Sequence, residues 1–319
     1  MRIGLLTPAT TKDLDRVVAL GLRSFEWVRF AESPAGPDHG EWRAFADTLA
    51  VWLSERGLRL SSIAAHYGNP LDPKQADRAR AVFYRAIEVA SHLKARTVAG
   101  FPGAVVRTWH NDRGGNPVYE PFENYIPDLV NYWRPVAEFA RDQGVRLAFE
   151  HCPQGQWHLP IMGFNMLDRP AMWERFFDSI GMENVGLEWD PAHLICQFID
   201  PVANLAKFGS RVFHVHAKDA YVDRRLLAEY GPCHPGVAEH RFPGLGEANW
   251  AQIVHMLLRK GYDSDLTIEG WHDPVYRDHA PSDQTGAGRP VLAGRRLEDA
   301  GVLVARRTLE ALVPRGDQD

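Results

Sequence analysis

The stretch Arg211-Val-Phe-His-Val-His-Ala-Lys-Asp219 has the pattern of a buried β-strand whose carboxyl end carries polar side chains. Successive side chains of a strand point to opposite faces. We therefore expect Val212, His214, His216 and Lys218 to share one face, with the residues between them on the other. Since the apolar residues of this stretch suit a core position, the polar face is expected to carry the chemistry.

Three other apolar runs resemble this one because each ends on an acidic residue. They are Val145-Arg-Leu-Ala-Phe-Glu150, Val185-Gly-Leu-Glu-Trp-Asp190 and Leu266-Thr-Ile-Glu269. Each carboxylate alone is as compatible with a salt bridge as with a ligand role. Clustered carboxylates without a cation are costly, so the four residues Glu150, Asp190, His216 and Glu269 together predict one divalent metal site. Three carboxylates with one imidazole suit a hard to borderline cation such as Mn²⁺, Mg²⁺ or Co²⁺, whereas Zn²⁺, a further alternative, would more usually take more nitrogen or sulfur.

Strand-like runs alternate with helix-like runs along the whole chain. Four further strands are expected at residues 2–6, 21–27, 58–65 and 96–101, and helices at 11–20, 42–56, 74–93, 125–143, 171–179, 202–208, 250–260 and 297–312. Residues 107–117 and 221–246 are expected to be loops. Eight alternating units predict a (β/α)8 TIM barrel of the α/β class, formed by residues 1–319 as a single domain. In such a barrel the active site lies at the carboxyl ends of the strands.

Composition narrows the class of protein. The chain of 319 residues has a net charge of −5, and 45% of its residues are hydrophobic. A mildly acidic chain is a poor partner for nucleic acid, which needs a basic surface. Three widely spaced cysteines indicate neither a disulfide framework nor a zinc ribbon. With no signal peptide and no apolar run long enough for a membrane span, we expect a cytoplasmic protein. The sequence is compatible with a homo-oligomer but does not define one.

Four more polar residues are expected around the same barrel mouth and are assigned to substrate binding. His66 follows the third strand, and His193 lies three residues after Asp190. Lys218 shares the face of His216, and Arg241 lies in a glycine-rich loop. Each also has a structural alternative: a histidine can cap a backbone, Lys218 can pair with Asp219, and Arg241 can hold its own loop in place.

Glu188 and three tryptophans are less specific. Glu188 should share the inward face of its strand with Asp190, and we expect it to be structural. Trp157, Trp189 and Trp271 flank the expected mouth. They would either stack on the faces of a sugar ring or belong to the core.

The sequence resembles the xylose-isomerase-like superfamily of sugar isomerases and epimerases over nearly its whole length. The motifs that carry the resemblance are Phe149-Glu150-His151, Asp190-Pro-Ala-His193, His214-Val-His216-Ala-Lys-Asp219, Arg241-Phe-Pro-Gly-Leu-Gly-Glu247 and Ile268-Glu269. In the ketose epimerase branch, the positions matching the four strand-end residues hold a single metal, often Mn²⁺. The resemblance implies that Glu150 and Glu269 also pass protons and that His193 and Arg241 contact substrate.

The superfamily also contains endonuclease IV, which binds three zinc ions with additional ligands. A His-Pro-Gly of that branch is similar to Phe101-Pro102-Gly103 here, so one ligand is missing. Its Asp-x-His is similar to Ala238-Glu239-His240, so a second ligand is missing. The resemblance therefore favours a one-metal enzyme over a nuclease.

The resemblance implies a metal-dependent sugar isomerase or epimerase that moves a proton next to a carbonyl through an enediolate. The expected substrate is a small keto-sugar or related polyol, and it is expected to be unphosphorylated because no glycine-rich phosphate cradle follows the last two strands. A lyase of the inosose dehydratase type, acting on a keto-sugar or cyclitol, is the alternative. An endonuclease-like hydrolase and a non-catalytic sugar-binding protein are weaker alternatives. The sequence does not identify the sugar.

Overall fold

Eight parallel strands close into a barrel in the computed structural model. It describes residues 1–66, 68–105, 109–111, 113–115, 117–119, 121–153, 164–270, 272–278 and 297–314. The barrel strands are β1 (Arg2–Thr7), β2 (Ser24–Trp27), β3 (Arg59–Ala64), β4 (Thr97–Gly100), β8 (Arg146–Glu150), β10 (Val185–Trp189), β11 (Val212–Ala217) and β14 (Asp265–Ile268). They follow one another around the barrel in chain order, and β14 pairs with β1 to close it. The predicted (β/α)8 barrel is confirmed.

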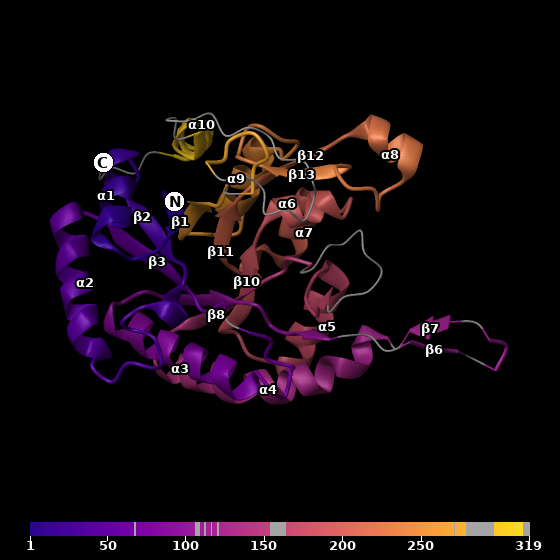
Figure 1. The fold of residues 1–319 in the computed structure, drawn as a ribbon, viewed down its shortest axis with the longest axis horizontal. Helices are drawn as coiled ribbons and strands as arrows, with labels where there is room; N and C mark the ends of the chain where they lie inside the picture. The colour runs from indigo at the N-terminus through magenta and orange to yellow at the C-terminus, as the bar shows by residue number, and fades with distance from the viewer. Residues whose placement is uncertain are drawn as a thin grey trace.

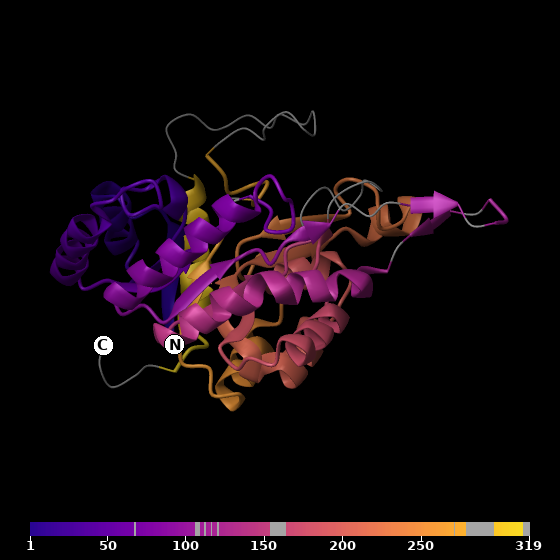
Figure 2. The same cartoon turned by 90° about the horizontal axis from the view of Figure 1, so that it is seen from below.

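Helices surround the barrel and connect its strands (Figures 1 and 2). They are α1 (Thr11–Ala19), α2 (Trp42–Arg56), α3 (Ala76–His92), α4 (Ile126–Asp142), α5 (Pro170–Ile180), α6 (Pro191–Cys196), α7 (Pro201–Phe208), α8 (Arg224–Tyr230), α9 (Trp250–Arg259) and α10 (Leu297–Glu310), with 3₁₀ turns η1 (Phe30–Glu32), η2 (Phe122–Tyr125) and η3 (Gly209–Arg211). Within the described residues, none of these helices combines the length and apolar character that crossing a bilayer requires.

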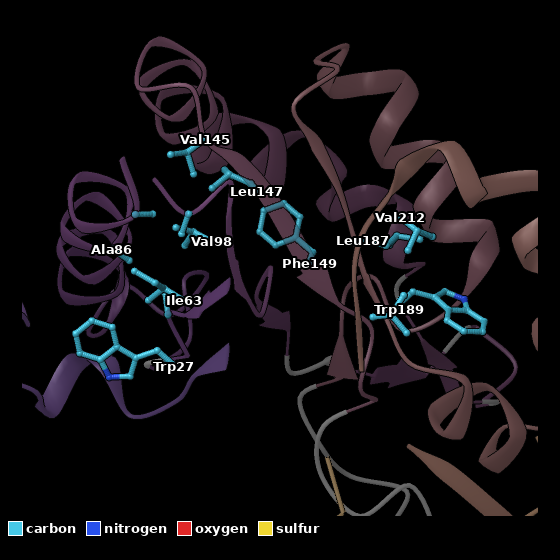
Figure 3. Packing of buried hydrophobic residues seen from close by; sticks show 14 of the residues in the cluster. Trp27, Ile63, Ala86, Val98, Val145, Leu147, Phe149, Leu187, Trp189 and Val212 are labelled. Carbon is cyan, nitrogen blue, oxygen red and sulfur yellow. The ribbon is translucent and has the colours of Figure 1, made fainter. Parts of the chain in front are cut away.

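The main core lies between the barrel and its helices. Ile63 of β3 and Val98 of β4 are fully buried and point towards the layer that contributes Ala86 of α3 (Figure 3). Trp133 of α4 packs edge-on against Phe149 of β8, with ring centroids 4.6 Å apart. Alternate residues of each strand thus serve the outer core, which leaves the other set for the barrel interior.

Strand β11 departs from the simple alternation that the sequence predicts. Val212 pairs with Leu187 and packs in the outer core, whereas Phe213 lies with two interior alanines of β4 and β8. The register between β10 and β11 shifts by one residue here, so two consecutive side chains, Phe213 and His214, face inward. Gly186 makes room for the ring, since a Cβ there would lie 2.6 Å from Phe213 Cε2. The prediction that Val212 shares the polar face is therefore wrong, while His214 and His216 face inward as predicted.

Three pairs of short strands lie outside the barrel: β5 (Ala104–Val105) with β9 (Phe164–Asn165), β6 (Trp109–Asn111) with β7 (Pro117–Tyr119), and β12 (Asp219–Val222) with β13 (Ala238–Arg241). The β6–β7 hairpin projects from the body (Figures 1 and 2). Both predicted loops therefore contain regular structure. Strands this short carry too few residues for a visible alternation, and β12 is held by its packing against α6.

Helix α6 lies in a segment for which the sequence predicted no helix. Asp190 is its N-cap, because Oδ1 accepts a hydrogen bond from Ala192 N at 2.8 Å. Pro191 occupies the first helical position, where the missing N–H has no consequence. The helix is only six residues long, but it fixes His193 on its first turn.

Asp219 joins the β12–β13 unit to the barrel through four hydrogen bonds. Its Oδ1 accepts from Ala220 N and Ala248 N, both at 2.8 Å. Its Oδ2 accepts from Gly244 N and Trp250 Nε1, both at 3.1 Å. Asp219 thus pairs with backbone and indole donors rather than with its neighbour Lys218, and it holds the loop that follows Arg241.

We expect the Asp219→Asn variant to be less stable than the wild type by about 1–3 kcal/mol. The amide nitrogen would face N–H donors and leave at least one of them buried without an acceptor. Urea denaturation measures the difference. Asp223→Asn is the matched control, because Asp223 caps α8 and asparagine is an equally good cap. Equal stability of the two variants would contradict the anchoring role.

Candidate metal and active site

The four strand-end residues meet at the carboxyl end of the barrel. Glu150 is the last residue of β8, Asp190 and Glu269 directly follow β10 and β14, and His216 lies in β11. One ligand atom from each lies within 4.8 Å of the others, and all four side chains are buried. Parallel strands of a barrel end at the same rim, which is why residues far apart in sequence converge here.

His216 presents its Nδ1 to the two glutamates. Nδ1 lies 3.2 Å from Glu269 Oε2 and 3.5 Å from Glu150 Oε1, but it is buried without a hydrogen-bond partner. Asp190 Oδ2 is likewise buried without a hydrogen bond, whereas the other oxygen of this carboxylate, Oδ1, caps α6. Two potential ligand atoms of this group thus form no hydrogen bond.

Two basic side chains lie among the carboxylates. Lys218 Nζ donates to Glu269 Oε2 at 2.6 Å and lies 3.1 Å from Asp190 Oδ2. His193 Nε2 lies 3.2 Å from Glu150 Oε1 and 3.1 Å from Asp190 Oδ2. Burial alone would lower both pKa values, but the neighbouring acids, Asp190 first, raise the pKa of Lys218 well above its usual value and that of His193 to about 10.

The two glutamates stay ionised despite their burial. Burial raises the pKa of Glu150, but the imidazoles of His193, His216 and His66 outweigh it and hold the pKa well below its usual range. The pKa of Glu269 is lowered in the same way, chiefly by the Lys218 ammonium. Two carboxylates in their basic form therefore face one buried site.

His66 and Arg241 lie farther from the centre of the site. His66 Nε2 is 3.4 Å from Glu150 Oε2, and its ring centroid is 4.4 Å from that of Phe101. Arg241 Nε donates to the buried Asp273 at 3.0 Å. This contact with Asp273 agrees with the structural alternative for Arg241, in which the side chain holds its own loop in place.

Several residues near the site were not singled out from the sequence. His151 is fully buried, and its Nε2 accepts a hydrogen bond from Asp190 N at 2.9 Å. The rings of His240 and His272 follow that of His193 in a row, with centroids 5.2 and 5.4 Å apart. Burial lowers the pKa of His272 to about 4 and that of His240 well below its usual value. Of these three histidines, His151 had a signal in the sequence, because it directly follows Glu150.

Of the three tryptophans expected near the mouth, only Trp189 belongs to the described residues. Trp189 is fully buried in the outer core (Figure 3). Trp157 and Trp271 lie outside the described residues.

A second polar layer lies directly below the site, inside the barrel. It consists of Glu26, Glu188, His214 and the far side of the His216 ring, all buried. Glu188 accepts from His214 Nδ1 at 2.9 Å, in agreement with a structural role. His214 and His216 outweigh the effect of burial and lower the pKa of Glu26 to about 2.

The upper group fits a hard divalent cation. It offers three carboxylates and one imidazole, the donor types that Mn²⁺ and Mg²⁺ accept. His216 Nδ1 and Asp190 Oδ2 are buried in this group without a hydrogen bond, although each has a charged neighbour within 3.2 Å. Such atoms are destabilising unless a ligand satisfies them.

Curated proteins that match the chain at low identity include an uncharacterized protein and an enzyme. YfiH of Bacillus subtilis, an uncharacterized protein, is 26% identical over 236 residues, which cover 68% of this chain and 72% of YfiH. An inosose dehydratase of Lacticaseibacillus casei is 22% identical over 240 residues, which cover 72% of this chain and 74% of that enzyme.

Solved structures share the fold. D-Psicose 3-epimerase from Clostridium cellulolyticum H10, solved with D-tagatose, superposes with a TM-score of 0.67 at 15% identity over 98% of this chain and 99% of the epimerase. The IolI protein with a bound zinc atom gives 0.65 at 16% identity over 98% of this chain and 96% of IolI. At these identities the structures show the fold alone. The family model of the xylose isomerase-like TIM barrel, however, matches residues 14–293, so the chain belongs to that family.

Proposed function

We propose that the protein is a metal-dependent sugar isomerase or epimerase that moves a proton next to the carbonyl of a keto-sugar or related polyol. The observation that carries the proposal is the pair of glutamates, Glu150 and Glu269, whose oxygens lie 3.5 and 3.2 Å from His216 Nδ1. The family and the fold shared with D-psicose 3-epimerase support it. One divalent cation, Mn²⁺ in the first place, would be held by these three residues and Asp190.

Two carboxylates can act as base and acid in turn. A cation bound there would act as a Lewis acid that lowers the pKa of the C–H next to the carbonyl and stabilises the enediolate. One glutamate removes that proton, and the other returns a proton from the opposite face or to the adjacent carbon. The first outcome is an epimerase and the second an isomerase.

The surrounding polar residues would bind the hydroxyl groups of the substrate. Lys218 Nζ and His193 Nε2 already contact the carboxylates and lie 3.3 Å from each other. His66 lies at the side of Glu150, with its face on Phe101. Arg241 would reach the substrate from the end of β13, just before the loop that Asp219 holds.

Deuterium exchange tests the proposed reaction. The metal-loaded protein is incubated in D₂O with a panel of ketoses, keto-glycosides and inososes, and uptake at carbon is followed by NMR. Solvent deuterium should enter the C–H position next to the carbonyl of the true substrate. Phosphodiester hydrolysis without exchange anywhere in the panel would contradict the proton-transfer reaction and favour the hydrolase.

A dehydratase is the second candidate. The observation that favours it is the contact between Lys218 and Glu269. The Lys218 ammonium lies 2.6 Å from Glu269, so an acid sits beside a base. Elimination requires both, because the departing hydroxyl must gain a proton. The match to inosose dehydratase agrees with this candidate. Mass spectrometry separates the two reactions, since an epimerase or isomerase keeps the substrate mass whereas a dehydratase releases one water.

Alanine variants at His193 and Arg241 are expected to lower turnover or raise KM by ~10-fold or more while metal content stays near that of the wild type. The reason is that both residues are proposed to contact substrate, and a charged hydrogen bond contributes about 1.5–3 kcal/mol. Steady-state kinetics with metal analysis of the same samples measures both effects.

Asp273→Asn is the matched control for Arg241. If Arg241 only holds its loop, weakening its partner should reproduce the kinetic effect of Arg241→Ala. Loss of metal from either alanine variant would instead make that residue a ligand.

A further inference from the structure

The His216 ring connects the two polar layers of the barrel. Its Nδ1 faces Glu150 and Glu269 in the upper layer. Its Nε2 lies 2.8 Å from Glu26 Oε2 in the lower layer. An imidazole can bind a cation through one nitrogen only if the ring is turned correctly and the other nitrogen keeps its proton.

The neighbouring groups leave Glu26 as the acceptor for this nitrogen. Glu188 Oε1 is farther from Nε2, at 3.4 Å, and already accepts from His214 Nδ1 at 2.9 Å. His214 is fixed in turn, because its Nε2 lies 3.0 Å from Thr267 Oγ1. Glu26 also comes from β2, across the barrel from β11, so it supports the ring from the side opposite its backbone.

We propose that Glu26 is a positioning residue that orients His216 and fixes its tautomer for metal binding. Its carboxylate accepts the Nε2 proton, which leaves the Nδ1 lone pair directed at Glu150, Asp190 and Glu269. A carboxylate on the second nitrogen also makes the imidazole a stronger ligand. This inference rests on the proposed metal site and adds a residue from a strand that supplies none of the four ligands.

The lower layer is itself a poor second metal site. Glu26 Oε1 and Glu188 Oε2 are buried there without a hydrogen bond, but the nitrogens of His214 and the Nε2 of His216 are already engaged within the layer or with Thr267. A cation there would have to displace these contacts. The arrangement is therefore better suited to support the upper site than to bind a metal.

Titration with Co²⁺ tests the inference, since its visible spectrum reports both affinity and ligand geometry. We expect Glu26→Gln to bind Co²⁺ ~10–100-fold more weakly with an altered spectrum, the range seen when such a partner is lost. Glu26→Asp keeps the charge and should recover part of the affinity. Asp265→Asn removes another buried carboxylate of the barrel and should match the wild type, because Asp265 contacts Arg59 rather than His216. Melting curves of the metal-free variants identify any that fail to fold, and Glu26→Asp then carries the test.

The outcomes separate this inference from the proposed function. If the wild type binds no Co²⁺, the metal site itself is wrong. If the wild type binds one Co²⁺ and Glu26→Gln binds it equally well with the same spectrum, the positioning role is wrong. Two Co²⁺ per wild-type chain, with one lost in Glu26→Gln, would make Glu26 a ligand of a second site and would also overturn the inference.

Discussion

Asp190→Ala and His216→Ala are each expected to weaken metal binding by more than ~100-fold, the upper end of what the loss of a supporting residue costs. The wild type should hold one divalent cation per chain. Each variant removes a buried ligand atom of the site that forms no hydrogen bond, Asp190 Oδ2 or His216 Nδ1. Elemental analysis after dialysis against a weak chelator measures the occupancy.

Asp190 also caps α6, so loss of the cap has to be separated from loss of a ligand by two further variants. Asp190→Asn keeps an oxygen for the cap but not a second carboxylate oxygen, and should lose metal as well. Asp200→Ala removes the cap of α7, where Oδ1 accepts from Val202 N at 2.8 Å, and should retain metal. Full occupancy in both Asp190→Ala and His216→Ala would show that the site is wrong.

Stoichiometry also distinguishes the one-metal enzyme from the hydrolase. His66, Glu150 and Glu188 form a third group of ligand atoms within 4.8 Å, which would be the place for a second cation. The Phe101 ring lies against His66, tilted by 36°, at this position, where the nuclease branch has a histidine. Two or three ions per chain would favour the hydrolase in spite of this substitution.

The ligand set was predictable because its signal is local. Each of Glu150, Asp190 and Glu269 follows a short apolar run, and His216 lies in such a run. The barrel follows from the alternation of eight strand and helix patterns, and the barrel then brings the strand ends together. Pattern and topology thus predicted the cluster, although its role as a metal site remains a proposal.

The partners of these residues were not predictable in the same way. Glu26 and His216 are 190 positions apart, and nothing in the sequence selects Glu26 over Glu188 as the acceptor. Lys218 could equally have paired with Asp219. In the structure Asp219 accepts hydrogen bonds from backbone donors, and Lys218 donates to Glu269. Such choices depend on distances of a few ångströms, which the residue pattern does not encode.

The largest kinetic effects are expected for Glu150→Gln and Glu269→Gln. Either variant should slow deuterium exchange into substrate by ~10²-fold or more, the scale of losing a general base. Glutamine keeps an oxygen that can bind a cation but cannot accept a proton from carbon at neutral pH. NMR in D₂O measures the exchange, normalised to metal content so that loss of metal is not mistaken for loss of the base. Glu247→Gln is the control, because Glu247 pairs with Arg224 away from the site.

The two variants should also differ from each other if each glutamate serves one face of the substrate. An epimerase acting in both directions would lose exchange from one epimer in Glu150→Gln and from the other in Glu269→Gln. Of the two glutamates, only Glu269 contacts Lys218. The epimer that loses exchange in Glu269→Gln is therefore the one whose proton is removed beside the Lys218 ammonium. Equal, wild-type exchange in both variants at full metal content would remove the glutamates from the chemistry. Loss of exchange only in Glu269→Gln, together with release of water, would instead place the acid and base of a dehydratase at Lys218 and Glu269.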